Sequence, residues 1–325
     1  FEENRLPAHS DHRVYANKSE LLRETSTLSY SLNGVWKFDY SINPNCTPDG
    51  FEALDYDCKN WEDIRVPAHI QMEGYDRPHY ANVAYPWDGR QALKSGEAPT
   101  DFNPVAGYVK YFTLPNGFIK DSLILHFEGV ESAAAVWLNG HYIGYCEDSF
   151  TPSEFDLTEY IVEGENKLAI QVTKWCAGSW LEDQDFFRFS GIFRDIYLYT
   201  KQKCHLEDIE IKQVFEKDNF ENVKLNFSVN LSNNADVKLV LFDAMDLTLK
   251  SNEFKVFDEM PVLYETVNNL HSGENKLSFD VTAPKLWSAE IPNLYTLYIE
   301  VFDKETLVEV SAVKVGIRLF EKNSK

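Results

Sequence analysis

Residues 181–195 hold the side chains of this chain that are best suited to chemistry. They read Leu-Glu-Asp-Gln-Asp-Phe-Phe-Arg-Phe-Ser-Gly-Ile-Phe-Arg-Asp, so acids and arginines stand among four phenylalanines. Carboxylates accept hydrogen bonds from hydroxyl groups and aromatic rings cover apolar C–H faces, so the segment suits a polyol ligand. It also suits a hard cation, which takes oxygen ligands. The alternative is a rigid loop between strands, held by arginine–aspartate pairs, because charges are rarely buried unless paired.

The charge of the chain limits its partners. With 325 residues the chain is long enough for two domains, and its net charge is −21. Nucleic acids and anionic membranes repel such a surface, so we expect neither as a partner, whereas neutral substrates remain suitable. No apolar run approaches the roughly 18 residues of a membrane-spanning helix, and no signal peptide is recognised. We therefore expect a cytoplasmic location.

The cysteines and histidines show no metal-site pattern. The chain has five cysteines, an odd number, and none has the spacing of zinc ligands. We expect free thiols in a reducing compartment. Five of the eight histidines are not spaced as a metal-binding set either, namely His9, His12, His69, His79 and His141.

The elements that would position residues 181–195 are strands. Residues 133–138 and 141–145 flank Asn139-Gly140, the preferred pair of a two-residue hairpin turn. Short apolar or alternating runs predict further strands at 35–38, after an Asn33-Gly34 turn, and at 123–127, 167–173 and 195–199, and residues 155–161 suit one helical turn. No segment keeps a helical period over ten residues, so we expect a nearly all-β protein.

The second half of the chain has a more regular alternation of apolar and polar residues. Residues 223–231 alternate strictly between apolar and polar, as a half-buried antiparallel strand does, and four more such segments follow at short spacing. This predicts an immunoglobulin-like sandwich without a disulfide over residues 201–325. Residues 1–30 are polar and without a period, and we expect an extended arm.

Four ordered motifs give the chain a family resemblance. Residues 180–195 resemble the sugar-binding-domain signature of family 2 glycoside hydrolases, and specifically the large β-galactosidases. Tyr80-Ala-Asn-Val-Ala-Tyr-Pro86 follows a matching segment at 66–75, and Trp137-Leu-Asn-Gly140 stands within matching segments between 127 and 156. The fourth motif runs from 284 to 318. The resemblance is close over 1–200 and 284–318, and between them it extends only to the strand pattern.

The resemblance implies three domains in the family. A jelly-roll sugar-binding domain would occupy residues 31–200 and an immunoglobulin-like sandwich residues 201–325, followed by a catalytic (β/α)₈ barrel. This chain ends at Lys325, where the barrel is expected to begin. Retaining glycoside hydrolysis needs two carboxylates about 5 Å apart, which the family carries on the barrel. We therefore expect no catalytic residue in this chain and no activity from it alone, although the parent protein would be a β-galactosidase.

Two residues acquire roles through the resemblance. Asn82 matches an asparagine that reaches the galactose subsite, and its amide offers both a donor and an acceptor. Without the resemblance, an Asx turn before Pro86 is the better reading of Asn82. Asp185 matches an aspartate that contacts galactosyl hydroxyls and ligates sodium, with the other ligands on the barrel. The resemblance implies sodium and magnesium in the parent enzyme and none firmly bound by this part.

The neighbours of these residues carry weaker expectations. Glu182 and Asp183 are predicted to pair with Arg188 or Arg194 and to hold the loop in shape. Phe186, Phe187 and Phe189 are predicted to pack against neighbouring strands or the barrel. Trp87 and the charged insertion 88–99 are predicted to border the site or a subunit contact.

Three other functions are compatible with these sequence features. A jelly roll rich in aromatic residues could be a free-standing carbohydrate-binding module. The arm and both β domains could instead serve assembly, since the resemblance implies other subunits of a homo-oligomer as partners. A related activity such as β-glucuronidase fits less well with residues 182–185 and with the loop around Asn82.

Overall fold

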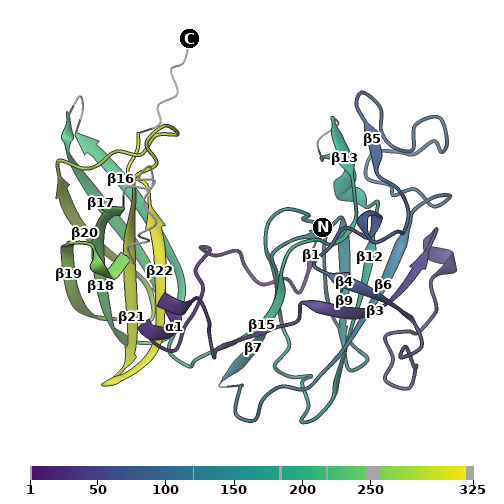
Figure 1. The fold of residues 1–325 in the computed structure, drawn as a ribbon, viewed down its shortest axis with the longest axis horizontal. Coiled ribbons are helices and arrows are strands. Elements are labelled where there is room, and N and C mark those ends of the chain that lie inside the picture. Colours follow the sequence, from purple (N-terminus) through teal and green to yellow (C-terminus); the bar gives the residue numbers. More distant parts are fainter. Residues whose placement is uncertain (1, 120, 183–184, 217–218, 246–256, 320–325) are drawn as a thin grey trace. The chain divides into compact units, whose positions relative to one another are not determined.

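The computed structural model describes residues 2–119, 121–182, 185–216, 219–245 and 257–319. The chain divides into two compact units (Figure 1). The first comprises Phe1–Ala8 and Ser29–Thr200, and the second His9–Leu28 and Lys201–Lys325. Each is a β-sandwich with its own core. None of the helices in the described ranges is both long and apolar enough to span a membrane.

The first unit is built on two main antiparallel sheets. The larger has the strand order β1 (Glu2–Glu3), β10 (His141–Cys146), β9 (Ala133–Leu138), β12 (Asn166–Thr173), β6 (Val105–Phe112), β3 (Gly34–Ser41) and β4 (Glu62–Val66). The smaller has the order β11 (Ser153–Asp156), β7 (Ser122–Phe127), β15 (Ile196–Lys201) and β2 (Ser29–Ser31). Two ribbons complete the unit: β13 (Phe186–Arg188) with β5 (His79–Ala81), and β14 (Gly191–Ile192) with β8 (Val130–Glu131). Short 3₁₀ turns lie at η1 (Pro44–Cys46), η2 (Ile70–Met72) and η3 (Ala177–Trp180).

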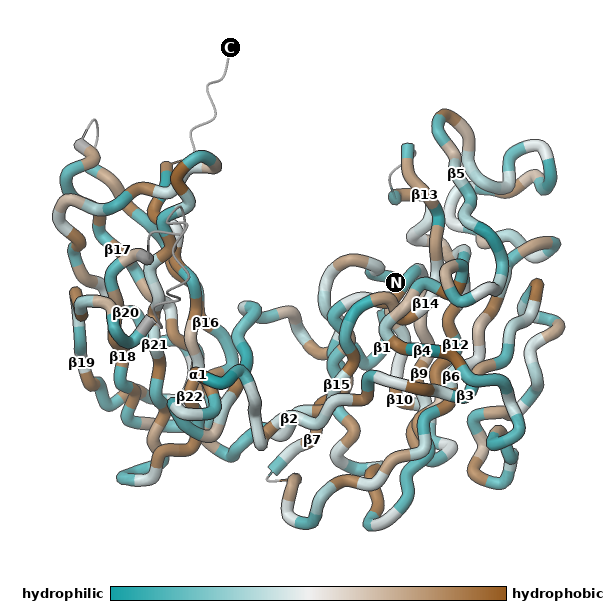
Figure 2. Tube along the Cα trace, viewed as in Figure 1, coloured by the Kyte–Doolittle hydropathy of each residue, from teal (hydrophilic) through white to brown (hydrophobic). Residues whose placement is uncertain are grey.

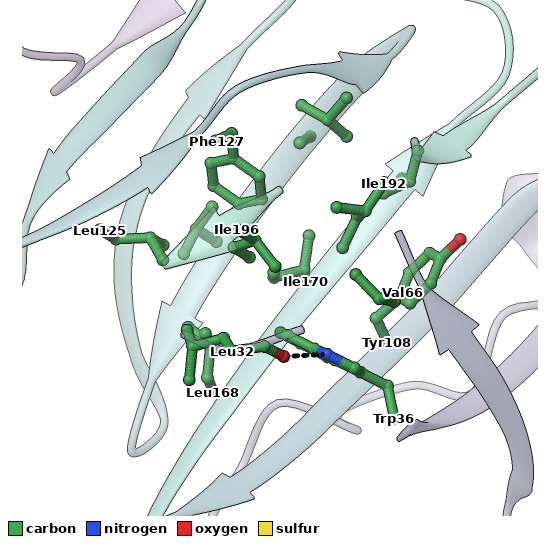
Figure 3. Packing of buried hydrophobic residues seen from close by; sticks show 14 of the residues in the cluster. Leu32, Trp36, Val66, Tyr108, Leu125, Phe127, Leu168, Ile170, Ile192 and Ile196 are labelled. Atoms are coloured by element: carbon green, nitrogen blue, oxygen red, sulfur yellow. Dashed lines mark hydrogen bonds between the residues drawn. The ribbon is translucent and has the colours of Figure 1, made fainter. Parts of the chain in front are cut away.

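The core of the first unit follows from the two-residue period of its strands. Side chains alternate between the two faces of a strand, and Figure 2 shows hydrophobic and hydrophilic residues mixed along the chain. Figure 3 shows Phe127, Leu168 and Ile196 pointing into one buried cluster. Trp36 also lies there, and its Nε1 donates to the carbonyl oxygen of Leu32 at 2.8 Å, which satisfies the one polar group of the ring.

The hairpin predicted from Asn139-Gly140 is confirmed. Strands β9 and β10 pair with His141 opposite Leu138, and both turn residues have positive φ, 53° and 84°. A type I′ turn requires this conformation. The expected helical turn at 155–161 is only partly found, since Phe155 belongs to β11 and a single turn follows, in which Ile161 N–H donates to Leu157 O at 3.2 Å.

The second unit has an immunoglobulin-like arrangement. One sheet has the order β16 (Leu206–Glu216), β17 (Asn219–Leu231) and β20 (Gly273–Thr282). The other has β19 (Val262–Leu270), β18 (Ala235–Met245), β21 (Leu294–Asp303) and β22 (Thr306–Val315), and a 3₁₀ turn, η4 (Phe257–Glu259), precedes β19. The chain passes from one sheet to the other after β17, β19 and β20, as in immunoglobulin folds. The apolar face of each strand enters one core.

The segment 9–28, expected to be extended, contains a helix and belongs to the second unit. Helix α1 (Lys18–Arg23) begins at Asn17, whose side chain accepts from Glu20 N–H at 3.0 Å. Glu20 in turn accepts from Ala16 N–H, so the two side chains satisfy amides that the first helical turn leaves free. Tyr15 forms a β-bridge with Val310, which attaches the segment to strand β22.

Candidate functional site

The ribbon β5–β13 brings the two predicted sugar ligands together. Strand β5 ends at Ala81, directly before Asn82, and strand β13 begins at Phe186, directly after Asp185. Ala81 pairs with Phe186 as the last pair of the ribbon, so Asn82 and Asp185 follow the two strands at the same end of it. Figure 1 shows the two strands side by side.

Tyr80 links these two residues and was not predicted as part of the site. Its hydroxyl donates to Asp185 Oδ1, and it also hydrogen-bonds with the Asn82 side chain. The bond to Asp185 is the main cause that raises the pKa of Tyr80. The spacing of Tyr80 and Asn82 was a usable signal, because residues two apart in a strand lie on the same face.

One face of the ribbon therefore presents polar and aromatic groups together. Phe187 pairs with Tyr80, and their ring centroids are 5.3 Å apart. Tyr80 is 52% exposed and Phe187 53%, and Asn82 and Asp185 are also exposed. A carboxylate and an amide can bond hydroxyl groups while the rings cover C–H bonds, so this face suits a polyol.

The opposite face of the ribbon is anchored by an ion pair. Arg188 is buried, and its Nη1 lies 2.9 Å from Glu182 Oε2. Ser149 donates to the other oxygen of Glu182 at 2.8 Å. The predicted pairing of Glu182 with Arg188 is thus confirmed, whereas Asp183 lies outside the described residues. Arg194 has a different role, because its Nη1 donates to Phe150 O at 2.8 Å.

The prediction that the phenylalanines of the motif pack against neighbouring residues holds for some of them. Phe189 packs against His69, with ring centroids 4.6 Å apart. Phe186 contacts the ring of Phe150 at 5.9 Å but remains 40% exposed. Phe187 lies instead on the face of the ribbon that also carries Tyr80, Asn82 and Asp185. We call this face the ligand face.

The insertion 88–99 is tied to the start of the motif by aromatic residues. Trp180 Nε1 donates to Glu97 O at 2.8 Å, and the rings of Trp180 and Trp87 are 4.9 Å apart. Tyr85 stacks on Trp87 at 5.2 Å and donates to Trp180 O at 3.3 Å. The insertion thus packs beside residue 180, and its role at the site or at a subunit contact stays a prediction.

Asp185 has chemistry that fits a hard cation, but its described surroundings do not form a complete site. Such an ion takes several oxygen ligands, and Asp185, Tyr80 and Asn82 offer oxygen atoms on one face. Within the described ranges, no three His, Cys, Asp or Glu side chains gather as a metal site. Further ligands for sodium would have to come from elsewhere, so this role of Asp185 stays a prediction. All five cysteines are free thiols.

Comparison with protein families gives two matches in chain order. The sugar binding domain of glycosyl hydrolases family 2 matches residues 29–202, and a second domain of glycosyl hydrolases family 2 matches residues 204–318. Together they span most of both units.

Comparison with curated proteins finds β-galactosidases. The chain is 46% identical to one from Halalkalibacterium halodurans and 42% identical to one from Clostridium acetobutylicum, over 99% and 100% of its length. It covers 31% and 35% of those proteins. It is 39% identical to a β-galactosidase large subunit from Latilactobacillus sakei, of which it covers 52%. The chain thus spans about a third to a half of the relatives it matches.

Solved structures show the same fold at low identity. A family 2 β-glucuronidase superposes with a TM-score of 0.65 and 20% identity, over 90% of this chain and 31% of that one. A β-glycosidase from Bacteroides vulgatus gives 0.64 and 21%, over 91% and 34%. These similarities show the β-sandwich fold of this chain.

Proposed function

Because this chain belongs to glycosyl hydrolase family 2, we propose that it forms the N-terminal part of a retaining β-galactosidase and completes the galactose subsite of that enzyme. The observation that carries the proposal is the hydroxyl of Tyr80 on the ribbon β5–β13, which hydrogen-bonds with both Asp185 and the Asn82 side chain. The identity of 37–46% to proteins named β-galactosidase supports the choice of sugar.

The ligand face performs binding and orientation in this proposal. Asp185 accepts hydrogen bonds from sugar hydroxyls, and a bond to a charged acceptor contributes about 1.5–3 kcal/mol. Asn82 offers a donor and an acceptor to a neighbouring hydroxyl. Tyr80 bonds to both side chains and limits their rotation, so less conformational entropy is lost when the sugar binds.

The charge of the face favours a neutral sugar over a uronic acid. A glucuronide carries a carboxylate, which Asp185 would repel at close range. The cation of the ribbon, Arg188, is buried on the other face and paired with Glu182. The similarity to β-glucuronidase structures therefore supports the same fold for this chain and does not support a glucuronide as its substrate.

The binding of a sodium ion by Asp185 also belongs to this proposal, and so does the contact of this chain with other subunits of a homo-oligomer. Asp185 would supply one oxygen to the ion, with the other ligands outside the described residues. The catalytic carboxylates would lie beyond this part of the enzyme, so the chain alone is expected not to hydrolyse galactosides.

A chimeric enzyme tests the proposal. The chain would replace the matching 31% of the Halalkalibacterium halodurans β-galactosidase, to which it is 46% identical. We expect hydrolysis of nitrophenyl β-galactoside by the chimera and none by the chain alone. A folded chimera that hydrolyses nitrophenyl β-glucuronide but not the galactoside would overturn the assignment, and so would turnover by the purified chain without the remainder.

A further inference from the structure

A buried carboxyl group lies beside the segment that connects β13 to β14. Glu131 ends strand β8 and pairs with Gly191, the first residue of β14. Only Phe189 and Ser190 separate β14 from β13, the strand that begins directly after Asp185. Glu131 is 2% exposed, so its side chain is almost entirely removed from water.

Glu131 contacts the chain directly after β13. Its carboxyl group accepts a hydrogen bond from the Phe189 backbone. Its Oε2 lies 3.8 Å from His69 Nδ1, a buried atom with no hydrogen-bond partner among the described residues. The His69 ring is held between Phe189, at 4.6 Å, and Phe193, at 4.9 Å. Phe189 is therefore in contact with both members of the pair.

The charged groups that act on Glu131 lie on β13, in the segment after η3 and directly after β12. Arg188, on β13, lowers its pKa, and Glu182, the ion-pair partner of Arg188, raises it. Lys174 also lowers it and is itself paired with Asp76. Burial is the largest effect and raises the pKa of Glu131 to about 7. Burial lowers the pKa of His69.

The protonation state of Glu131 changes how strongly it attracts neighbouring donors and cations. The ionised carboxylate attracts the Phe189 N–H and the Arg188 guanidinium, whereas the neutral acid attracts both less. Arg188 and Phe187 are neighbours on the three-residue strand β13, which thus connects the surroundings of Glu131 with the ligand face.

We propose that Glu131 is a positioning residue for the ligand face, and that gain or loss of its proton adjusts β13 and with it Phe187 and Asp185. An effect of this movement on sugar binding rests on the proposed function, whereas the movement itself does not. Proton uptake at Glu131 would then change how the face presents its carboxylate and ring within the neutral pH range.

Fluorine NMR of the 325-residue chain tests this inference without a sugar. The chain is labelled with 4-fluorophenylalanine, which does not titrate, and the Phe187 signal is assigned by Phe187→Leu. We expect the Phe187 signal to move between pH 6 and 8 in the unaltered chain and to stay constant in Glu131→Gln. Glu309→Gln, the same change at a buried acid of the other unit, should leave the movement intact.

Two outcomes overturn the proposal. One is a Phe187 signal that does not change between pH 6 and 8, and the other is a change that persists in a folded Glu131→Gln variant. If circular dichroism shows that Glu131→Gln does not fold, Glu131→Asp decides, because it keeps a carboxyl group at a different reach. A pH midpoint in Glu131→Asp identical to that of the unaltered chain then counts against Glu131. Because no ligand is used, these results do not depend on whether the galactoside proposal holds.

Discussion

Glu309 makes the stability of the second unit depend on pH. It lies in strand β22, is 2% exposed, and its Oε1 has no hydrogen-bond partner within the described residues. Burial raises its pKa to about 8, although a hydrogen bond to the backbone of Leu206 and the charge of Lys201 lower it. The substitution Glu309→Gln removes this titration and keeps the size of the side chain.

The sign and size of the effect follow from proton linkage. In the unfolded chain the carboxyl has its ordinary pKa of 4.5. Between that value and about 8 the folded unit keeps a proton that the unfolded chain has released, so stability falls as pH rises. The stabilisation is complete below pH 4.5 and is lost as the pH passes through about 8. The slope is about 1.4 kcal/mol per pH unit, or about 5 kcal/mol in total.

Urea unfolding between pH 5 and 9 measures this slope. Trp287 is the one tryptophan after residue 200, so its signal in a 5-fluorotryptophan-labelled chain follows the second unit. Glu309→Gln is expected to flatten the fall in unfolding free energy between pH 5 and 8. Glu305→Gln, an exposed acid in the same hairpin, serves as the control and should retain the slope. Equal slopes in both variants would show that Glu309 does not cause the pH dependence.

Two further predictions concern the first unit. Gly144→Ala is expected to destabilise it by about 1–3 kcal/mol in urea unfolding, because the new Cβ would lie 2.5 Å from Glu3 O; an unchanged midpoint would contradict this. Lys167→Met is expected to cost at least about 3 kcal/mol, since the buried ammonium donates to three backbone carbonyls at 2.6–2.8 Å. A loss below about 1 kcal/mol would show that these carbonyls find other donors.

The sequence predicted best where local chemistry decides the structure. Asn139-Gly140 predicted its hairpin because few residues tolerate two successive positive φ angles. A second case is the sequence Gly-Glu-Asn-Lys-Leu, which occurs at 164–168 and 273–277. Asn166 donates to Val162 O and Gly164 O, and Asn275 donates to His271 O and Gly273 O in the same way. The same five-residue sequence thus forms the same asparagine-stabilised turn at both places.

The helix in the N-terminal segment was missed because its signals are short. Helix α1 has six residues, too few to show a helical period. Its start was nonetheless marked, since Asn17 followed three residues later by Glu20 is a capping-box pattern. Its docking on strand β22 depends on an apolar surface that includes Tyr298 and Val310, nearly 300 residues away in the chain.

The candidate site was predicted residue by residue but not as a surface. Asn82 and Asp185 were found through motifs, which carry no information on pairing. The pairing that brings them to the same end of a ribbon comes from two three-residue strands, too short to be recognised from the sequence. Tyr80 and Glu131 escaped prediction because their importance depends on which groups face them in the fold.

Contact between Asp185 and the sugar is measured by the kcat/KM of the chimeric enzyme for nitrophenyl β-galactoside. Asp185→Ala is expected to lower this value at least about tenfold, which corresponds to the loss of about 1.4 kcal/mol of transition-state stabilisation. Asp121→Ala, which removes an exposed acid at the start of β7, should leave it unchanged. A kcat/KM that is the same in both variants would contradict the account.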